Sequence, residues 1–117
     1  MWRDEPLLLD MLLAATDALE FGDGLSQSQF NATRLHQMAI IRCLEVIGEA
    51  ASKVSQDFRT AHPEIEWREI IGMRHRLIHN YAAIRLDVVW AVLHDKLPGL
   101  IAALKPLIPP EDNSQVP

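Results

Sequence analysis

Apolar residues recur every three or four positions in four long stretches of the chain, and this spacing predicts amphipathic helices. The stretches span roughly residues 5–21, 34–55, 67–80 and 86–104. Two shorter segments, 26–33 and 56–62, predict brief helical connections. The apolar stripe is plainest in the second stretch, at Ile40, Leu44, Ile47, Ala51 and Val54. No segment alternates as a strand would, so we expect an all-α fold, an antiparallel bundle of four to five helices.

Residues that start, stop or strain a helix add detail to this pattern. Asp4 is placed to cap the first helix, and Ser26 followed by Gln29 has the spacing of a capping box. Pro98 should kink or restart the last helix, because proline cannot donate an interior helical hydrogen bond. Gly48 costs the second helix about 1 kcal/mol relative to alanine, and close helix packing is one reason for a glycine there.

Length and composition predict one helical domain followed by a loose tail. A chain of 117 residues, 49% of them hydrophobic, can bury a core of its own. We assign residues 1–105 to this domain. Residues 106–117 hold four prolines in a polar context and predict a flexible C-terminal tail. A domain this small buries a modest share of its surface, so dimerisation would help to stabilise it.

Cysteine content and hydropathy point to a soluble, cytoplasmic protein. The single cysteine, Cys43, cannot form an internal disulfide and falls in an apolar helix, so we expect a buried, inert thiol. The first residues carry acids rather than the long apolar run of a signal peptide. No stretch reaches the roughly 20 apolar residues that a membrane span needs.

Charge is distributed unevenly along the chain. The formal net charge is −5, which argues against a protein that coats nucleic acid through bulk electrostatics. Residues 67–86, however, contain four arginines and one acid, a local charge of +3, which leaves −8 for the remainder. An acidic body with one basic patch can hold an RNA phosphate locally, and its acidic surface would suit a basic protein partner.

The basic patch contains two arginines, two histidines and a tyrosine within residues 74–81. Arginine binds phosphate, and histidine both takes and gives a proton near neutral pH. Together they suit metal-independent RNA cleavage, in which a histidine deprotonates a ribose 2′-OH and arginine stabilises the charge on the phosphoryl oxygens. DNA has no 2′-OH and could not react in this way. Arg85 is a candidate for a further phosphate contact.

Helical geometry separates the two residues best suited to this chemistry. Arg74 and His79 lie roughly 140° apart on an ideal helix, too far to share one face. Either the helix end is distorted, or the same cluster on a second subunit completes the site, which points to a symmetric homodimer.

Two simpler interpretations of the cluster remain open. Basic residues are also favoured at a helix C-terminus by the macrodipole, with no catalytic role. His75 and His79 have the i, i+4 spacing of a metal-ligand pair. No cysteine or carboxylate stands nearby at a ligand spacing, so we expect neither a metal nor another cofactor.

The cluster also carries a family resemblance. Arg74, His79 and Tyr81 form the pattern Arg-x-x-x-x-His-x-Tyr, which resembles the signature of HEPN-domain proteins, in particular the HepT toxins of HEPN/MNT toxin–antitoxin pairs. Residues 42–50 are similar to the second-helix segment of that family, and residues 62–74 to the run that leads into its motif. The resemblance therefore covers nearly the whole chain.

The resemblance implies an all-α homodimer whose two motifs face each other across a cleft. It implies an endoribonuclease toxin that cuts tRNA or mRNA, with a small nucleotidyltransferase as its antitoxin. Arg74 and His79 would be the catalytic pair. By their chemistry and position in the cluster, His75 and Arg76 would assist. Tyr81 would position the RNA and accept AMP from the antitoxin.

The chain departs from the family pattern at two positions and leaves other functions open. His75 stands where the family usually has asparagine, and Asn80 where it often has glycine. These departures bear on rate and substrate preference. The alternatives to a nuclease are a non-catalytic HEPN module that binds a nucleotide or a partner protein, and a purely structural dimeric scaffold.

Overall fold

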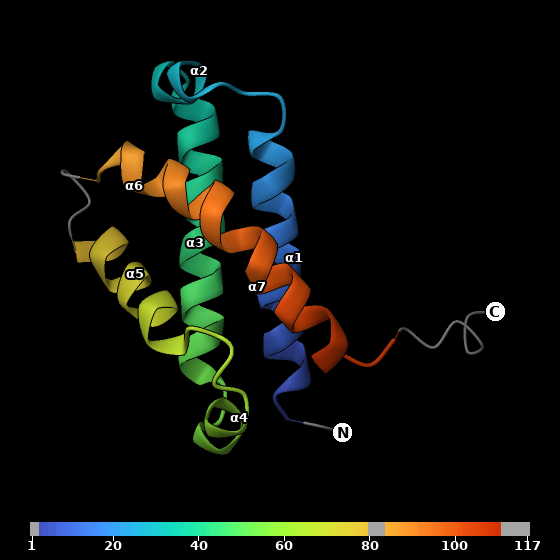
Figure 1. Ribbon diagram of the computed structural model, residues 1–117. Helices are drawn as coiled ribbons and strands as arrows, with labels where there is room; N and C mark the ends of the chain where they lie inside the picture. Colours follow the sequence, from blue (N-terminus) through green and yellow to red (C-terminus); the bar gives the residue numbers. More distant parts are fainter. Residues whose placement is uncertain (1–2, 80–83, 111–117) are drawn as a thin grey trace.

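The computed structural model describes residues 3–79 and 84–110, and these residues form helices and no strands (Figure 1). The elements are α1 (Glu5–Gly22), α2 (Gln27–Ala32), α3 (Arg34–Lys53), α4 (Gln56–Ala61), α5 (Trp67–His79), α6 (Leu86–Ala91), the π-helical turn η2 (Val92–Lys96), α7 (Leu97–Leu104) and the 3-10 turn η3 (Lys105–Leu107). The predicted all-α bundle is confirmed.

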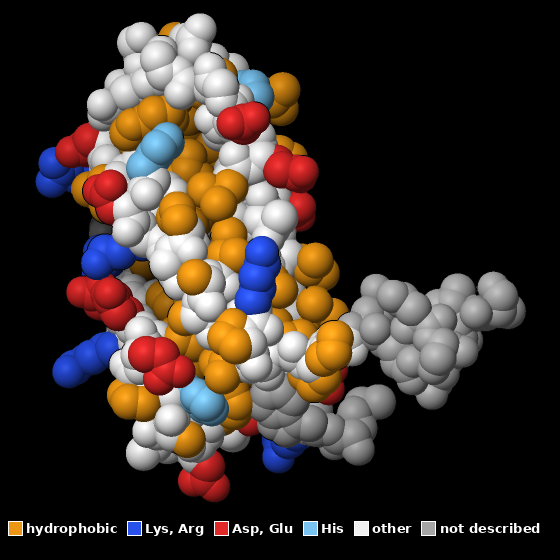
Figure 2. Space-filling model, turned by 45° about the vertical axis from the view of Figure 1, so that its right-hand side comes forward, with side chains coloured by type: hydrophobic (Ala, Val, Ile, Leu, Met, Phe, Trp, Pro, Cys, Tyr) orange, Lys and Arg blue, Asp and Glu red, His pale blue; other side chains and the backbone are white. Residues whose placement is uncertain are grey.

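The bundle is built around α3. Helices α1 and α3 run antiparallel along their whole length, and α5 packs on another side of α3. The last part of the chain, α6 to α7, crosses in front of α3 and α1 as one bent rod (Figure 1). On the face seen after a 45° turn about the vertical axis, hydrophobic side chains gather along the middle, and most charged side chains lie toward the edges (Figure 2). No helix in the described ranges is long and apolar enough to cross a membrane.

The core comes from the stripes that the sequence pattern predicts. The buried side chains of α1 include Leu8, Met11, Ala15 and Ala18, and those of α3 include Ile40, Leu44, Ile47, Ala51 and, at its end, Val54. Phe30 of α2 is fully buried and packs against Trp90 with ring centroids 5.3 Å apart. Cys43 is 8% exposed, so the predicted buried thiol is confirmed.

The prediction for Asp4 is right in position and wrong in partner. Asp4 precedes α1, but its side chain makes no hydrogen bond to that helix. Its buried carboxylate instead accepts hydrogen bonds from the backbone N–H of Ser55 (2.9 Å) and from the Ser55 hydroxyl (2.6 Å). The Ser55 hydroxyl in turn accepts from the N–H of Phe58 at the start of α4. The start of α1 is thus tied to the junction of α3 and α4.

The predicted break in the last helix takes the form of a π turn. Pro98 cannot donate to the carbonyl four residues earlier, and the backbone widens in the turn just before it. The N–H of Leu97 bonds to the carbonyl of Val92, five residues earlier, and α7 starts at Leu97. Helix α7 ends at Leu104. The predicted tail begins at residue 106, but its first residues continue through η3, and Leu107 and Ile108 pack against the core. Residues 111–117 lie outside the described chain, so their flexibility stays a prediction.

Candidate functional site

The basic cluster lies on α5, whose position is set by a close contact with α3. A Cβ placed on Gly48 would stand 2.4 Å from the Cβ of Arg74 and 3.1 Å from the backbone oxygen of Ile70. Only a glycine leaves room for this approach of the two helices. Leu77, one turn after Arg74, is 4% exposed and anchors the same face of α5 in the core. The contact holds Arg74 at the boundary between α3 and α5.

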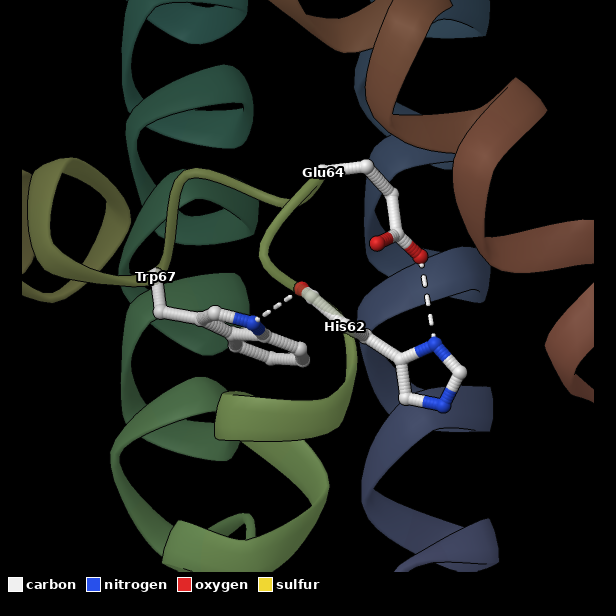
Figure 3. A network of polar contacts seen from close by, with 3 residues as sticks. All are labelled: His62, Glu64 and Trp67. Atoms are coloured by element: carbon white, nitrogen blue, oxygen red, sulfur yellow. Dashed lines mark hydrogen bonds and ion pairs between the residues drawn. The ribbon is translucent and has the colours of Figure 1, made fainter.

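The start of α5 is fixed by a second set of contacts (Figure 3). The indole N–H of Trp67 donates to the backbone oxygen of His62 (2.9 Å), and the imidazole Nδ1 of His62 lies 3.1 Å from a carboxylate oxygen of Glu64. Phe58 packs edge-on against the Trp67 ring at 6.2 Å. His62 is therefore part of the loop that orients α5.

Arg74 is half-buried and has no hydrogen bond or ion pair within the part of the chain that the structure describes. Its stem is packed by the contact with Gly48, so the direction of the side chain is constrained near its root. A guanidinium held in this way without an internal anion can bind the phosphate of a ligand.

The two sides of α5 carry different residues. Helical geometry places Ile78 on the same side of α5 as Arg74, and Arg76 roughly 200° away from Arg74. On α3, the same geometry turns Met38 and Glu45 toward the side of Arg74. We call the surface formed by Met38, Glu45, Arg74 and Ile78 the motif flank.

The motif flank exposes apolar side chains beside charged ones. Met38 is 40% exposed and Ile78 is 43% exposed. Glu45 forms an ion pair with Arg42 at 3.4 Å, and one turn further along α3 Lys53 pairs with Glu49 at 3.5 Å. These exposed pairs contribute little to stability. The flank thus combines a cationic group with apolar area that no part of the described chain covers.

The other predicted site residues are only partly brought together. His75 is exposed on the outer side of α5. Arg76 lies on the opposite side from Arg74, with a guanidinium nitrogen 3.6 Å from where a Cβ on Gly72 would stand. The geometry therefore separates Arg76 from Arg74 instead of forming one arginine pair. His79 is the last residue of α5, and its side chain and Tyr81 lie outside the described structure.

Arg85 directly precedes α6 and is engaged by a neighbour. It makes two hydrogen bonds to Asp87, one from each of two guanidine nitrogens, at 2.7 and 3.3 Å. This contact lowers the pKa of Asp87. A phosphate that binds Arg85 would have to compete with Asp87.

A metal site at His75 and His79 would need a third ligand nearby. Among the described residues, no three side chains of His, Cys, Asp or Glu gather closely enough to share a metal ion. His75 belongs to this part of the chain, whereas the side chain of His79 does not.

The sequence pattern did not single out the residues on the other side of α5. Glu69, in the first turn of α5, and Glu66, just before it, form ion pairs with Lys96, which lies about 30 positions further along the chain. Such a contact between distant segments leaves no periodic signal. For Gly48 a signal existed, because a glycine within a long helix needs a packing reason.

Comparison with known proteins places this chain in a family. The family model described as "Ribonuclease HepT-like" matches residues 11–107. A "probable ribonuclease HepT" of Thermococcus cleftensis is 40% identical over 81 residues, which cover 69% of this chain and 74% of that protein. A protein of Caldanaerobacter subterraneus, provisionally named an RNase, is 31% identical over 111 residues, covering 95% of this chain and 99% of that protein.

A further relative, from Methanocaldococcus jannaschii and also provisionally named an RNase, is 35% identical over 93 residues, covering 80% of this chain and 85% of that protein. No solved structure matches the chain significantly. The family match spans the helices that carry and position the cluster, from α1 to the turn after α7. The chain therefore belongs to the HepT-like ribonuclease family of the HEPN superfamily.

Proposed function

We propose that the protein is a metal-independent endoribonuclease that acts in the cytoplasm as the toxin of a toxin–antitoxin pair. The observation that carries the proposal is Arg74, whose stem packs against Gly48 and whose guanidinium has no internal partner among the described residues, in a chain of a ribonuclease family. His79 ends the same helix.

The reaction needs a base, an acid and a cation around one phosphate. His79 takes the proton of a ribose 2′-OH, and the oxygen attacks the adjacent phosphorus. The bond from phosphorus to the 5′-oxygen breaks, and this oxygen receives a proton from a protonated imidazole, for which His75 is the candidate. Arg74 stabilises the negative charge on the phosphoryl oxygens. The products are a 2′,3′-cyclic phosphate and a 5′-hydroxyl.

A homodimer would complete this site. Arg74 and His79 point roughly 140° apart on a straight helix, so two copies of the motif are needed to surround one phosphate from both sides. The motif flank supports such a dimer, because Met38 and Ile78 expose apolar area next to Arg74. A second flank placed against it would bury both side chains and leave a basic cleft for RNA between the protomers.

The resemblance also supplies a partner and a mode of inactivation. In the proposed pair, a nucleotidyltransferase antitoxin transfers AMP from ATP to the hydroxyl of Tyr81 and releases pyrophosphate. The attached phosphodiester is negatively charged and two residues from His79. It would compete with the RNA phosphate for Arg74 and block cleavage.

Cleavage of total tRNA by the purified protein, with EDTA present, tests the proposal. We expect wild type to cut, and His79→Ala and Arg74→Ala to lose activity while keeping their helical circular dichroism. Arg68→Ala is the matched control, because Arg68 is an exposed arginine on the same helix outside the motif. If wild type does not cut, intact mass shows whether the protein was purified with AMP attached. An unmodified protein that binds RNA without cutting it would instead be a binding module.

A further inference from the structure

A groove runs along the side of α5 that faces away from the motif flank. It encloses about 480 Å³ between α3, α5, η2 and α7. Its floor is apolar and is formed chiefly by Leu44, Ile47, Ile70, Met73, Leu97 and Leu100. A floor of this kind accepts one or two apolar side chains, and the flexible Met73 lets it adapt its shape.

The groove is lined by more acids than bases. Of the described residues, Glu64, Glu66, Glu69 and Asp95 line it against Arg76 and Lys96, which gives four negative and two positive charges. The groove therefore has a local charge of −2. This sign disfavours RNA, whose phosphates the carboxylates would repel. It favours instead a partner segment that brings a positive charge.

Lys96, the cation that pairs with two of these acids, is held weakly. The ammonium of Lys96 lies 3.5 Å from a carboxylate oxygen of Glu66 and 3.9 Å from one of Glu69, and all three side chains are more than half exposed. Exposed pairs of this type are worth little, so an incoming cation can displace Lys96. The two carboxylates also share a hydrogen bond, which lowers the pKa of Glu66 and raises that of Glu69.

Gly99 supplies an independent observation. It lies in the wall of the groove, in the first turn of α7. A Cβ placed on Gly99 would meet no atom of the described residues within 4 Å, so no contact in this part of the chain requires a glycine there. Glycine is a poor helix former, and its missing side chain keeps this wall low enough for another backbone to approach.

We propose that this groove docks a segment of a partner protein that places one or two apolar side chains on the floor and a lysine or arginine against Glu66 and Glu69. The docked segment touches α5 on the side away from Arg74. Binding here therefore leaves the motif flank open, and the inference stands whether or not the protein cuts RNA.

Selection of a phage-displayed library of random twelve-residue peptides against the purified wild-type protein tests this inference. Counter-selection against Gly99→Gln removes peptides that bind elsewhere. We expect the enriched peptides to combine apolar residues with a lysine or arginine. Binding of a synthetic peptide with the enriched sequence should weaken about tenfold or more in Gly99→Gln and in the double variant Glu66→Gln/Glu69→Gln.

Ala102→Gln is the matched control, since Ala102 is exposed on the same helix and does not line the groove. Circular dichroism and thermal melting confirm that each variant is folded. The inference is overturned if no peptide survives counter-selection, if the enriched peptides lack a cation, or if the control weakens binding as much as Gly99→Gln does. A wild-type dimer that dissociates in Gly99→Gln would also overturn it, since the groove would then be occupied by a second copy.

Discussion

Gly48 and Arg74 lie so close together that no side chain larger than a hydrogen atom fits at position 48 without moving α5. The neighbouring atom is the Cβ of Arg74, which is fixed to the backbone and cannot swing away as a side-chain end would. The proposed phosphate-binding residue is thus positioned by a glycine 26 residues earlier in the chain (74 − 48). The fold and the site depend on the same contact.

Gly48→Ala should destabilise the protein despite the better helix propensity of alanine. The added methyl group would stand 2.4 Å from the Cβ of Arg74, and relieving such overpacking costs about 1–3 kcal/mol. Urea unfolding followed by circular dichroism measures the change. Gly72→Ala is the matched control, because among the described residues its Cβ would meet only a guanidinium nitrogen of Arg76, at an ordinary 3.6 Å. The control should be neutral or stabilising by up to about 1 kcal/mol. Equal effects of the two substitutions would refute the close contact.

Asp4→Ala should lower the free energy of unfolding by about 1–3 kcal/mol, because it removes the acceptor of two hydrogen bonds from Ser55. The same urea titration measures this loss. Asp10→Ala removes an exposed carboxylate of α1 and should stay within about 0.5 kcal/mol of wild type. If the two variants were equally stable, the buried link from Asp4 to Ser55 would contribute nothing.

Cys43 should react slowly with iodoacetamide in the folded protein. Burial raises the pKa of its thiol, the charge of Asp17 raises it further, and Arg42 opposes both. At a given pH, fewer thiolates are therefore present in the folded state than in the unfolded state. Mass spectrometry should show slow alkylation of native protein at pH 8 and rapid alkylation in urea. Equal rates would mean that the thiol is accessible.

The same raised pKa makes stability depend on pH. The unfolded chain ionises first, above about pH 8.5, so the folded state should lose stability as the pH rises beyond that value. Below that pH both states are protonated and Cys43 has no effect. Cys43→Ala should remove this part of the alkaline loss, which unfolding titrations at pH 7 and pH 9.5 will detect.

Ile78→Asp should dissociate the proposed dimer. A carboxylate in the motif flank would have to be desolvated between the two protomers, which opposes association. Sedimentation velocity is expected to show a dimer for wild type and a monomer for the variant. Leu13→Asp is the control, because Leu13 is 53% exposed on α1, away from the motif flank. A monomeric wild-type protein would contradict the proposed arrangement.

The helices follow from local patterns, and for this reason the sequence predicts them well. The stripe of α3 and the capping box of Ser26 and Gln29 appear in the structure as expected. Pro98 correctly predicts a break in the last helix, but the sequence does not specify that the break takes the form of a π turn over Val92–Lys96. The partner of Asp4 lies 51 residues away, a contact that no local rule can supply.

The candidate site likewise combines features set by local sequence with contacts between distant segments. The motif and the helix that carries it follow from residue spacing alone, whereas the sequence pattern groups Arg76 with Arg74 and the structure separates them. The contact that positions Arg74 and the acidic groove behind it do not follow from spacing, since both join segments that are distant in the sequence. The arrangement of His79 and Tyr81 stays a prediction, because their side chains lie outside the described structure.

The chemical identity of the RNA ends tests the central claim most directly. Wild-type protein would be incubated with total tRNA in EDTA, and the ends of the fragments analysed by enzymatic end-group assays and mass spectrometry. Attack by the 2′-OH predicts 2′,3′-cyclic phosphates and 5′-hydroxyls, produced by wild type and Arg68→Ala but not by His79→Ala. Fragments with 3′-hydroxyls and 5′-phosphates, or cleavage that EDTA abolishes, would contradict the proposed mechanism.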